Sequence, residues 1–326
     1  MNLVEYVCPR CHSALEGDAA RYLCKACNSV YPIIAGIPDF RVYPDPYIDL
    51  EADRAKGLHL DSQPLSFADL VRYYYSITPE VPPDLAQHYT THHLAGVTRG
   101  HAILARLAHY GLERGAHTLD LGCGTGGFLV AAAGQPLIGV DIAFRWLIVG
   151  RRRLREQGID VPLVCACADY LPFADHTFSL VVAEHVLEHI ADAGRVMGAI
   201  KRVSLPDGAF LARTVNRFAL APEPHVGVWG VGFLPRSAMS KYVQRAKGIP
   251  YEHIYLRGEA GWRRLLRESQ FTRFDVRYPY LQDIDYQHQS PLIRRLFGLY
   301  ARMANSVPPL RPFLTQFGPY LDMVVR

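Results

Sequence analysis

The sequence contains no uninterrupted apolar run near the roughly 20 residues that a membrane-spanning helix needs. It also lacks a strong charge of either sign, because 35 lysines and arginines face 31 aspartates and glutamates. This balance does not call for a polyanionic partner. Hydrophobic residues make up 49% and charged residues 20%, which excludes a disordered or fibrous chain. Residues 1–6 show no basic start of a signal peptide, so we expect a cytoplasmic protein.

Cysteine is scarce outside the N-terminus, since four of the seven cysteines lie within residues 8–27. They form two C-x2-C pairs, and twelve residues between the pairs let a hairpin bring four thiolates around one tetrahedral Zn²⁺. Two disulfides and a redox-active C-x-x-C are the alternatives. A reducing cytosol disfavours the first, and a catalytic pair would not occur twice. We predict a zinc ribbon over residues 1–42 with a structural Zn²⁺ bound by Cys8, Cys11, Cys24 and Cys27.

The segments CPRC, CKAC and YPIIAGIPDF (31–40) resemble the zinc-ribbon family of small tRNA-methyltransferase activator proteins. Members of that family also occur fused to methyltransferases. Within residues 1–42, four basic residues balance four acidic ones, so the ribbon lacks the basic face that RNA binding needs. We therefore interpret the ribbon as a packing module.

The rest of the chain divides into a connector and a larger α/β domain. Residues 43–95 contain helix-compatible stretches and no clear strand pattern, which predicts a helical connector or cap. In the domain at 96–326, HTLDLGCGTGG (117–127) predicts a buried strand turning at glycines into a helix. Two further strands, at 136–141 and 163–167, lead to Asp141 and Asp169. Carboxylates at adjoining strand ends suit a ribose and an adenine amino group, and the glycine spacing does not complete the dinucleotide fingerprint.

Several ordered motifs resemble class I S-adenosylmethionine (SAM)-dependent methyltransferases: LDLGCGTGG, VD at 140–141, ADYLPF, FSLVVAEHVLEHI and LPDGAFLARTVNR. The resemblance implies a Rossmann-like seven-stranded sheet with strand seven antiparallel. It places strand six at 271–279, strand seven at 320–326 and an insertion at 280–317 between them. It also implies a SAM site formed by Asp120, Gly122, Cys123, Gly124, Thr125, Gly126, Asp141, Ile142, Asp169, Tyr170 and Glu184.

The segments EHVLEH (184–189) and TVNR (214–217) resemble the corresponding parts of ubiquinone-type O-methyltransferases. His185 stands where an acid is expected, so the resemblance does not extend to a carboxylate-bound divalent metal. His185 could remove the proton of an acceptor hydroxyl at neutral pH, or it could only shape the pocket while Glu188 and His189 cap and pack a helix. Acceptor contacts are expected from Tyr74, Asn216, His225 and Trp229, with burial of Trp229 and Phe233 as loop anchors the alternative.

Two basic helices invite different interpretations. The segment at 290–306 has an apolar face with three arginines opposite, a pattern that fits packing on its own domain, a pocket cover or a peripheral membrane contact. Packing on its own domain is the simplest interpretation. The basic run RRRLR at 151–155 is interpreted as a solvated helix face.

Taken with the resemblance, these features predict a SAM-dependent methyltransferase acting at oxygen on a small molecule, a sugar or a lipid-linked metabolite. An RNA methyltransferase that docks its substrate with the ribbon is the first alternative. The neutral ribbon and the absence of an N/D-P-P-Y tetrapeptide argue against it. The second alternative is a noncatalytic SAM-binding activator protein, which the intact SAM motifs disfavour.

Overall fold

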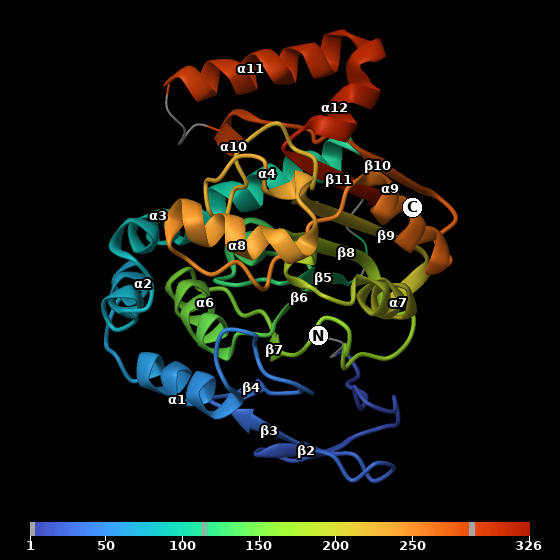
Figure 1. The fold of residues 1–326 in the computed structure, drawn as a ribbon. Helices are drawn as coiled ribbons and strands as arrows, with labels where there is room; N and C mark the ends of the chain where they lie inside the picture. Colours follow the sequence, from blue (N-terminus) through green and yellow to red (C-terminus); the bar gives the residue numbers. More distant parts are fainter. Residues whose placement is uncertain (1–3, 113–114, 116, 287–290) are drawn as a thin grey trace. The chain divides into compact units, whose positions relative to one another are not determined.

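The computed structural model describes residues 4–112, 115, 117–286 and 291–326 (Figure 1). The first three residues of the expected ribbon and residues 287–290 of the expected insertion lie outside the described residues. The chain forms two compact units. Unit 1 comprises Met1–Val181 and Arg202–Gly208, and unit 2 comprises Val182–Lys201 and Ala209–Arg326.

The N-terminal segment of unit 1 forms a small antiparallel sheet. Its strands pair in chain order: β1 (Glu16–Gly17), β2 (Arg21–Leu23), β3 (Val30–Ile34) and β4 (Ile37–Pro38). Aromatic rings fill the space that so short a sheet cannot cover, and Phe40 is fully buried with its ring 5.3 Å from the rings of Tyr6, Tyr22 and Tyr31. The segment after β4 then runs beside the larger sheet of the chain, where the backbone N–H of Phe40 donates to the carbonyl of Cys165 at 2.8 Å.

Helices follow the ribbon in the range expected for the connector. They are α1 (Leu50–Asp61), α2 (Phe67–Ser76) and α3 (Pro83–Leu94), followed by α4 (Gly96–His109). Asp49 and Ser66 cap the first two, because their side chains accept from backbone N–H groups in the first turn. In unit 1, α1 and α2 lie against α6 (Phe144–Glu156), where a Cβ on Gly57 would meet the ring of Phe144 at 2.5 Å (Figure 1).

The basic run at 151–155 is not a solvated face, so that expectation is wrong. Arg151 donates to the carbonyl of Ala35 and pairs with Asp61, while Arg152 donates to the carbonyls of Leu65 and Gln63. The guanidinium of Arg153 lies 3.7 Å from the ring centroid of Phe67. Arg151, Arg152 and Arg153 therefore fasten the ribbon and connector to α6, and of the four arginines in the run only Arg155 is exposed.

The parallel part of the larger sheet lies in unit 1 and is almost wholly buried. Its strands are β5 (Thr118–Leu121), β6 (Leu137–Asp141) and β7 (Leu163–Cys165), with β5 paired to β6 and β6 to β7. Helix α5 (Gly127–Ala131) starts directly after the glycine turn. A Cβ at Gly127 would lie 2.4 Å from the backbone of Gly96, so only glycine lets α4 approach this closely.

The sheet has seven strands in the order β10-β11-β9-β8-β5-β6-β7. Two of them, β8 (Phe178–Glu184) and β9 (Ser204–Val215), contribute residues to both units. Strand β11 (Tyr320–Val325) lies between β9 and β10 (Phe274–Arg277) and is antiparallel to both. This order confirms the expected seven-stranded sheet with its antiparallel last strand. Strand β10 is shorter than the range 271–279, since the N–H of Tyr278 donates to the Thr315 hydroxyl.

Unit 2 also contains the helices that follow β8 and β9 and the segment before β11. They are η1 (Leu187–His189), α7 (Ala193–Val203), η2 (Val231–Phe233), α8 (Arg236–Lys247), α9 (Glu259–Glu268), α10 (Asp283–Tyr286), α11 (Pro291–Ser306), η3 (Pro308–Leu310) and α12 (Arg311–Phe317). The last two residues of α7, Arg202 and Val203, belong to unit 1. Ala304 of α11 packs with Tyr278 and Leu314. Among the described helices, none combines the length and the hydropathy needed to cross a bilayer.

A leucine-rich stripe on α11 faces away from this packing. Leu292, Leu296, Leu299 and Met303 recur at helical spacing and are 68%, 57%, 54% and 37% exposed. The expectation that the apolar face packs on its own domain therefore holds for Tyr300, which packs against Tyr278, Ala304 and Leu314, but is wrong for this stripe. Spacing alone could not separate the two, because both sets are apolar and lie on one helix.

Candidate functional site

The four N-terminal cysteines converge in unit 1. The sulfurs of Cys8 and Cys27 are 3.5 Å apart, as are those of Cys11 and Cys24, and all four sulfurs lie within 4.8 Å of one another. A tetrahedral Zn²⁺ with bonds of about 2.3 Å implies sulfurs about 3.8 Å apart. All seven cysteines lie in the described part of the chain and none forms a disulfide. The spacing therefore fits a four-sulfur zinc site.

The glycine turn and the two acids beside it form the centre of the predicted cofactor site in unit 1. Gly122, Gly124 and Gly126 have φ angles of 78°, 49° and 71°, which suit glycine. The carboxylate of Asp141, at the end of β6, accepts the backbone N–H groups of Gly124 and Ala143, both at 2.8 Å. Asp141 thus holds the glycine turn in place.

The charge of Asp141 depends on this setting. Burial raises the pKa of Asp141 to about 6, against the opposing effect of its two backbone hydrogen bonds. Hydroxyl groups that donate hydrogen bonds to such a carboxylate favour its ionised form, because each hydrogen bond stabilises the negative charge. Asp120, on the neighbouring strand end, is only 4% exposed and brings a second acid to the same edge.

The third strand end supplies Asp169 and Tyr170. The N–H of Tyr170 donates to the carbonyl of Cys167, which fixes the turn after β7. Because β5, β6 and β7 are neighbours in the sheet, their carboxyl ends meet at one edge. The structure therefore brings together the predicted SAM residues of unit 1, which are Asp120, Gly122, Cys123, Gly124, Thr125, Gly126, Asp141, Ile142, Asp169 and Tyr170.

In unit 2, β8 ends at Glu184 and delivers His185 next to a buried carboxylate. The Nδ1 atom of His185 lies 3.2 Å from Oε1 of Glu188, and the Thr214 hydroxyl donates to Oε2 of Glu188 at 2.9 Å. Burial alone would raise the pKa of Glu188, but the His185 hydrogen bond and the nearby histidines lower it to about 2. An ionised carboxylate only accepts, so Nδ1 carries the hydrogen and Nε2 is left as the acceptor in the neutral ring.

This arrangement resembles the way a carboxylate orients an imidazole in acid–base sites. His185 has a positive φ of 56°, uncommon outside glycine, and its side chain is 31% exposed. Glu184 lies 3.7 Å from the other ring nitrogen. The geometry can therefore present a basic nitrogen to solvent while burying the partner that orients the ring.

Glu188, His189 and His225 form a second group whose ligand atoms lie within 4.8 Å of one another. The Nδ1 atom of His225 contacts Glu223 at 2.5 Å, and this hydrogen bond raises the pKa of His225 despite its burial. Burial lowers the pKa of His189 to about 4, so its ring stays neutral near pH 7. Because both Glu188 oxygens already accept hydrogen bonds, we describe the group as a polar network.

The predicted acceptor residues occupy contrasting settings. In unit 1, Tyr74 is 7% exposed, and its ring packs 4.3 Å from that of Trp146. In unit 2, the Asn216 amide donates to the carbonyls of Thr315, Gln316 and Gly318. Each of these side chains thus has a structural role that the sequence did not reveal.

The loop that follows β9 carries aromatic side chains that are exposed instead of packed. Trp229 is 61% exposed and Phe233 is 49% exposed, so the alternative that burial of these rings anchors the loop is wrong. The loop is held instead by burial of Val228 and Val231 in an apolar cluster. Polar contacts add to this, including the Tyr242 hydroxyl, which donates to the carbonyl of Trp229 at 3.0 Å. Two aromatic rings are therefore available for contact with another molecule.

Sequence reasoning missed two residues beside the predicted cofactor site. The Tyr43 hydroxyl lies 2.5 Å from Oδ1 of Asp169, and Nδ1 of His93 lies 3.4 Å from the Thr125 hydroxyl. The separations along the chain are 126 and 32 residues, so no local pattern predicts either contact.

Comparison with known proteins agrees with this geometry. Residues 119–212 match the family described as "Methyltransferase domain". A sterol 4-C-methyltransferase from Caenorhabditis elegans is 36% identical over 104 residues, covering 31% of this chain and 31% of the relative. A ubiquinone/menaquinone biosynthesis C-methyltransferase from Haemophilus ducreyi is 37% identical over 109 residues, covering 31% and 42%.

A ubiquinone biosynthesis O-methyltransferase from Azorhizobium caulinodans is 35% identical over 115 residues, covering 33% of this chain and 45% of the relative. The chain thus spans between 31% and 45% of the length of these three curated relatives. The sequence matches to these relatives and the order of the seven strands both indicate a methyltransferase domain. The chain contains a class I SAM-dependent methyltransferase domain.

Proposed function

We propose that the whole chain is a SAM-dependent methyltransferase that methylates a hydroxyl of a small molecule, sugar or lipid-linked metabolite. The observation that supports this most is the set of acids and glycines at the adjoining ends of β5, β6 and β7, within the matched methyltransferase domain. In this proposal Asp120 and the glycine turn bind the amino-acid part of SAM, Asp141 the ribose, and Asp169 with Tyr170 the adenine. Glu184 completes the cofactor set.

The acceptor class is supported by residues of unit 2. When bound, SAM supplies a methyl group on a sulfonium, so the protein has to align the acceptor and accept its proton. The Nε2 atom of His185 takes this proton, while Glu188 stabilises the resulting imidazolium through Nδ1. His225 and Trp229 are proposed to contact the acceptor. The relatives are named for sterols and for ubiquinone or menaquinone biosynthesis, which favours a lipophilic acceptor.

Methyl transfer by the full chain tests this function. SAM with a radiolabelled methyl group is incubated with phenols, sugars, lipid-linked hydroxyl compounds and total RNA. We expect label on a hydroxyl acceptor, and loss of both SAM binding and transfer in Asp141→Ala. Salt-sensitive labelling of RNA alone would favour an RNA methyltransferase. SAM binding without transfer to any acceptor would favour an activator protein, and either result would contradict the proposal.

We also propose that the four N-terminal cysteines hold a structural Zn²⁺. Four thiolates fill the tetrahedral shell, so no position remains for a water or a substrate. The ribbon has few residues with which to form its own core, and zinc binding there contributes free energy to its folding. Its role in this proposal is therefore to hold the ribbon, not to take part in the transfer.

Replacing Cys24 with serine should lower the bound zinc well below one ion per chain, because a hydroxyl is a much weaker Zn²⁺ ligand than a thiolate. We expect the ribbon to become the first segment cut by a protease. Metal analysis and limited proteolysis measure both effects. Cys123→Ser is the control, since Cys123 is buried in the glycine turn, outside the cluster. One zinc per chain and full protection in Cys24→Ser would show that the four-cysteine assignment is wrong.

A membrane contact by α11 extends the proposed acceptor class. Its exposed stripe of Leu292, Leu296, Leu299 and Met303 stands on a helix with three arginines and no acidic residue, as in helices that lie on anionic bilayers. A lipid-linked acceptor would then be reached at the bilayer surface.

The full chain should therefore sediment with vesicles of phosphatidylglycerol and much less with vesicles of phosphatidylcholine. Leu296→Glu should weaken the binding, because it places a charge in the apolar stripe. Leu220→Glu is the control, since Leu220 is equally open at 55% exposed but lies outside α11. Equal sedimentation of the two variants would contradict the contact, and a dimer that Leu296→Glu dissociates would assign the stripe to a second copy.

A further inference from the structure

The chain leaving the ribbon passes along the strand end that carries Asp169. The backbone N–H of Val42 approaches the sulfur of Cys167 at 3.5 Å, and the Cys167 thiol donates to the carbonyl of Tyr43 at the same distance. Cys167 is buried just after β7. These two contacts hold the backbone of Tyr43 against the turn that leads to Asp169.

The side chain of Tyr43 completes this contact. Its hydroxyl donates to Oδ1 of Asp169 at 2.5 Å, and its ring lies edge-on to the ring of Tyr170 with 6.2 Å between centroids. Hydrogen bonding to Asp169 and partial burial both raise the pKa of Tyr43, with burial the larger cause, so the hydroxyl keeps its proton at neutral pH. Tyr43 is nevertheless 41% exposed, so part of the ring remains open to a ligand.

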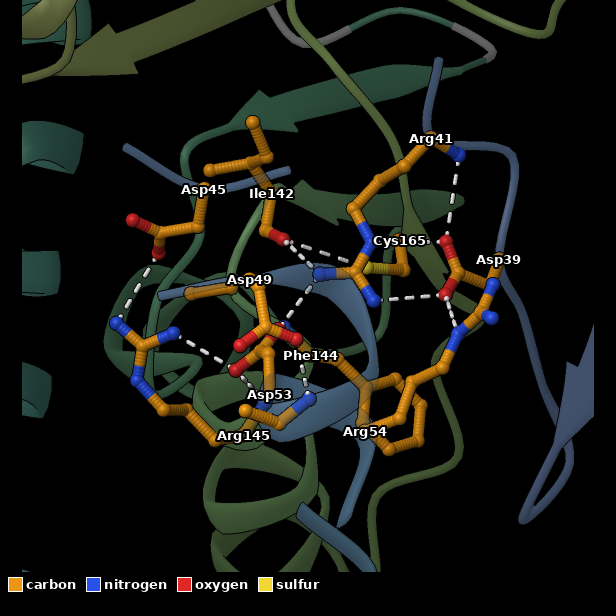
Figure 2. A network of polar contacts seen from close by, with 12 residues as sticks. Asp39, Arg41, Asp45, Asp49, Asp53, Arg54, Ile142, Phe144, Arg145 and Cys165 are labelled. Atoms are coloured by element: carbon orange, nitrogen blue, oxygen red, sulfur yellow. Dashed lines mark hydrogen bonds and ion pairs between the residues drawn. The ribbon is translucent and has the colours of Figure 1, made fainter. Parts of the chain in front are cut away.

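A buried ionic network includes Arg41, two residues before Tyr43, and Asp45, two residues after it; Asp45 pairs with Arg145 at 3.0 Å (Figure 2). Arg41 pairs with Asp39 and Asp53 and also donates to the carbonyl of Ile142 at 3.1 Å. Asp53 in turn accepts the N–H of Phe144 at 2.8 Å. The segment that carries Tyr43 is therefore fastened to the turn after Asp141 as well as to the turn before Asp169.

Both turns belong to the proposed nucleoside site, and Tyr43 comes from outside the matched domain at 119–212. A carboxylate that accepts a hydrogen bond from an amino group must point one of its oxygens at that donor. The plane of the carboxylate therefore has to be fixed. The Tyr43 hydroxyl fixes it by engaging Oδ1. Because the ring is part exposed beside Tyr170, it can also form one wall around a flat base.

We propose that Tyr43 is a positioning residue of the SAM site, which orients the Asp169 carboxylate toward the adenine amino group. This inference rests on the proposed function, in which Asp169 binds adenine. It gives the segment between the ribbon and the connector a direct part in cofactor recognition.

The test uses the full chain and two ligands, S-adenosylhomocysteine and its deaminated analogue S-inosylhomocysteine, with affinities measured by calorimetry. Tyr43→Phe keeps the ring and removes only the hydroxyl. We expect it to weaken S-adenosylhomocysteine about tenfold, the effect of losing one hydrogen bond to a charged group. The analogue lacks the amino group, so its affinity should change less than about threefold. Tyr73→Phe is the matched control, because it removes a tyrosine hydroxyl bonded to His59 at 2.8 Å.

Two results would overturn the inference. An equal loss for both ligands would mean that the hydroxyl only supports the fold, and no loss for either would mean that Asp169 is oriented without it. Asp169→Ala separates these from failure of the proposed function. If that variant binds S-adenosylhomocysteine as tightly as the unmodified chain, Asp169 does not bind adenine. If it binds weakly while Tyr43→Phe binds normally, only the role of Tyr43 is wrong.

Discussion

Replacing Asp53 with alanine is expected to lower the free energy of unfolding by about 3–5 kcal/mol. Asp53 is fully buried, and its carboxylate pairs with Arg41 at 2.6 Å and with Arg145 at 2.7 Å (Figure 2). It also accepts the N–H of Phe144 at the start of α6. When this side chain is removed, the buried guanidinium groups of Arg41 and Arg145 lose the carboxylate that pairs with both of them. Uncompensated buried charge is among the most destabilising changes a protein can undergo.

The neighbouring Glu51 provides a matched control for this prediction. Glu51 lies on the same helix and pairs with Arg54 at 2.6 Å, but its side chain is 78% exposed. Glu51→Ala should therefore cost only about 0–1 kcal/mol, because water screens an exposed pair. Urea unfolding of the full chain, followed by circular dichroism, measures both variants. Similar midpoints for the two would contradict the role assigned to the buried network.

Features encoded by short contiguous segments were predicted from the sequence. The run at 117–127 combines an apolar strand with closely spaced glycines, and the structure shows β5, the positive φ angles and α5 in that order. The antiparallel last strand followed from the resemblance and is confirmed by β11. The first of these features depends on residues that are close in the chain, which is why a local pattern suffices. The direction of β11 depends on its pairing with β9, which is distant in the chain, so it could be expected only from the resemblance.

The buried ionic network could not be predicted in this way. The pair formed by Asp53 and Arg145 joins residues 92 positions apart, and neither residue belongs to a periodic motif. The basic run was misjudged for a related reason, since its partners include backbone carbonyls, which every residue carries. Charge in a sequence identifies neither a buried partner nor a backbone acceptor, so a solvated face was the default expectation.

Side chains of the candidate site show the same limit. Asn216 was predicted to contact the acceptor because it follows β9, yet its amide donates to three carbonyls near residues 315–318. Glu188 was considered as a helix cap, but it is a fully buried carboxylate between His185 and Thr214. The roles of Asn216 and Glu188 depend on hydrogen-bond partners that only the fold brings together.

His185→Ala is expected to lower turnover by roughly 10²–10⁴ while leaving SAM affinity within a few fold. The histidine is a proposed proton acceptor whose orientation comes from Glu188, and none of the cofactor contacts proposed in unit 1 involves it. Loss of the base should matter most for the least acidic acceptor hydroxyls, because their protons are the hardest to remove. Turnover across a series of acceptors of graded acidity, with SAM affinity from calorimetry, measures both quantities.

Glu188→Gln supplies the companion variant, since it keeps the size of the side chain and removes only the charge that stabilises the imidazolium. Its loss of turnover should be smaller than that of His185→Ala, and the double variant should be no slower than His185→Ala alone, because both changes act on one proton transfer. Nearly unchanged turnover in His185→Ala, with the same dependence on pH, would remove His185 from the mechanism. Catalysis would then rest on alignment of the acceptor with the methyl group.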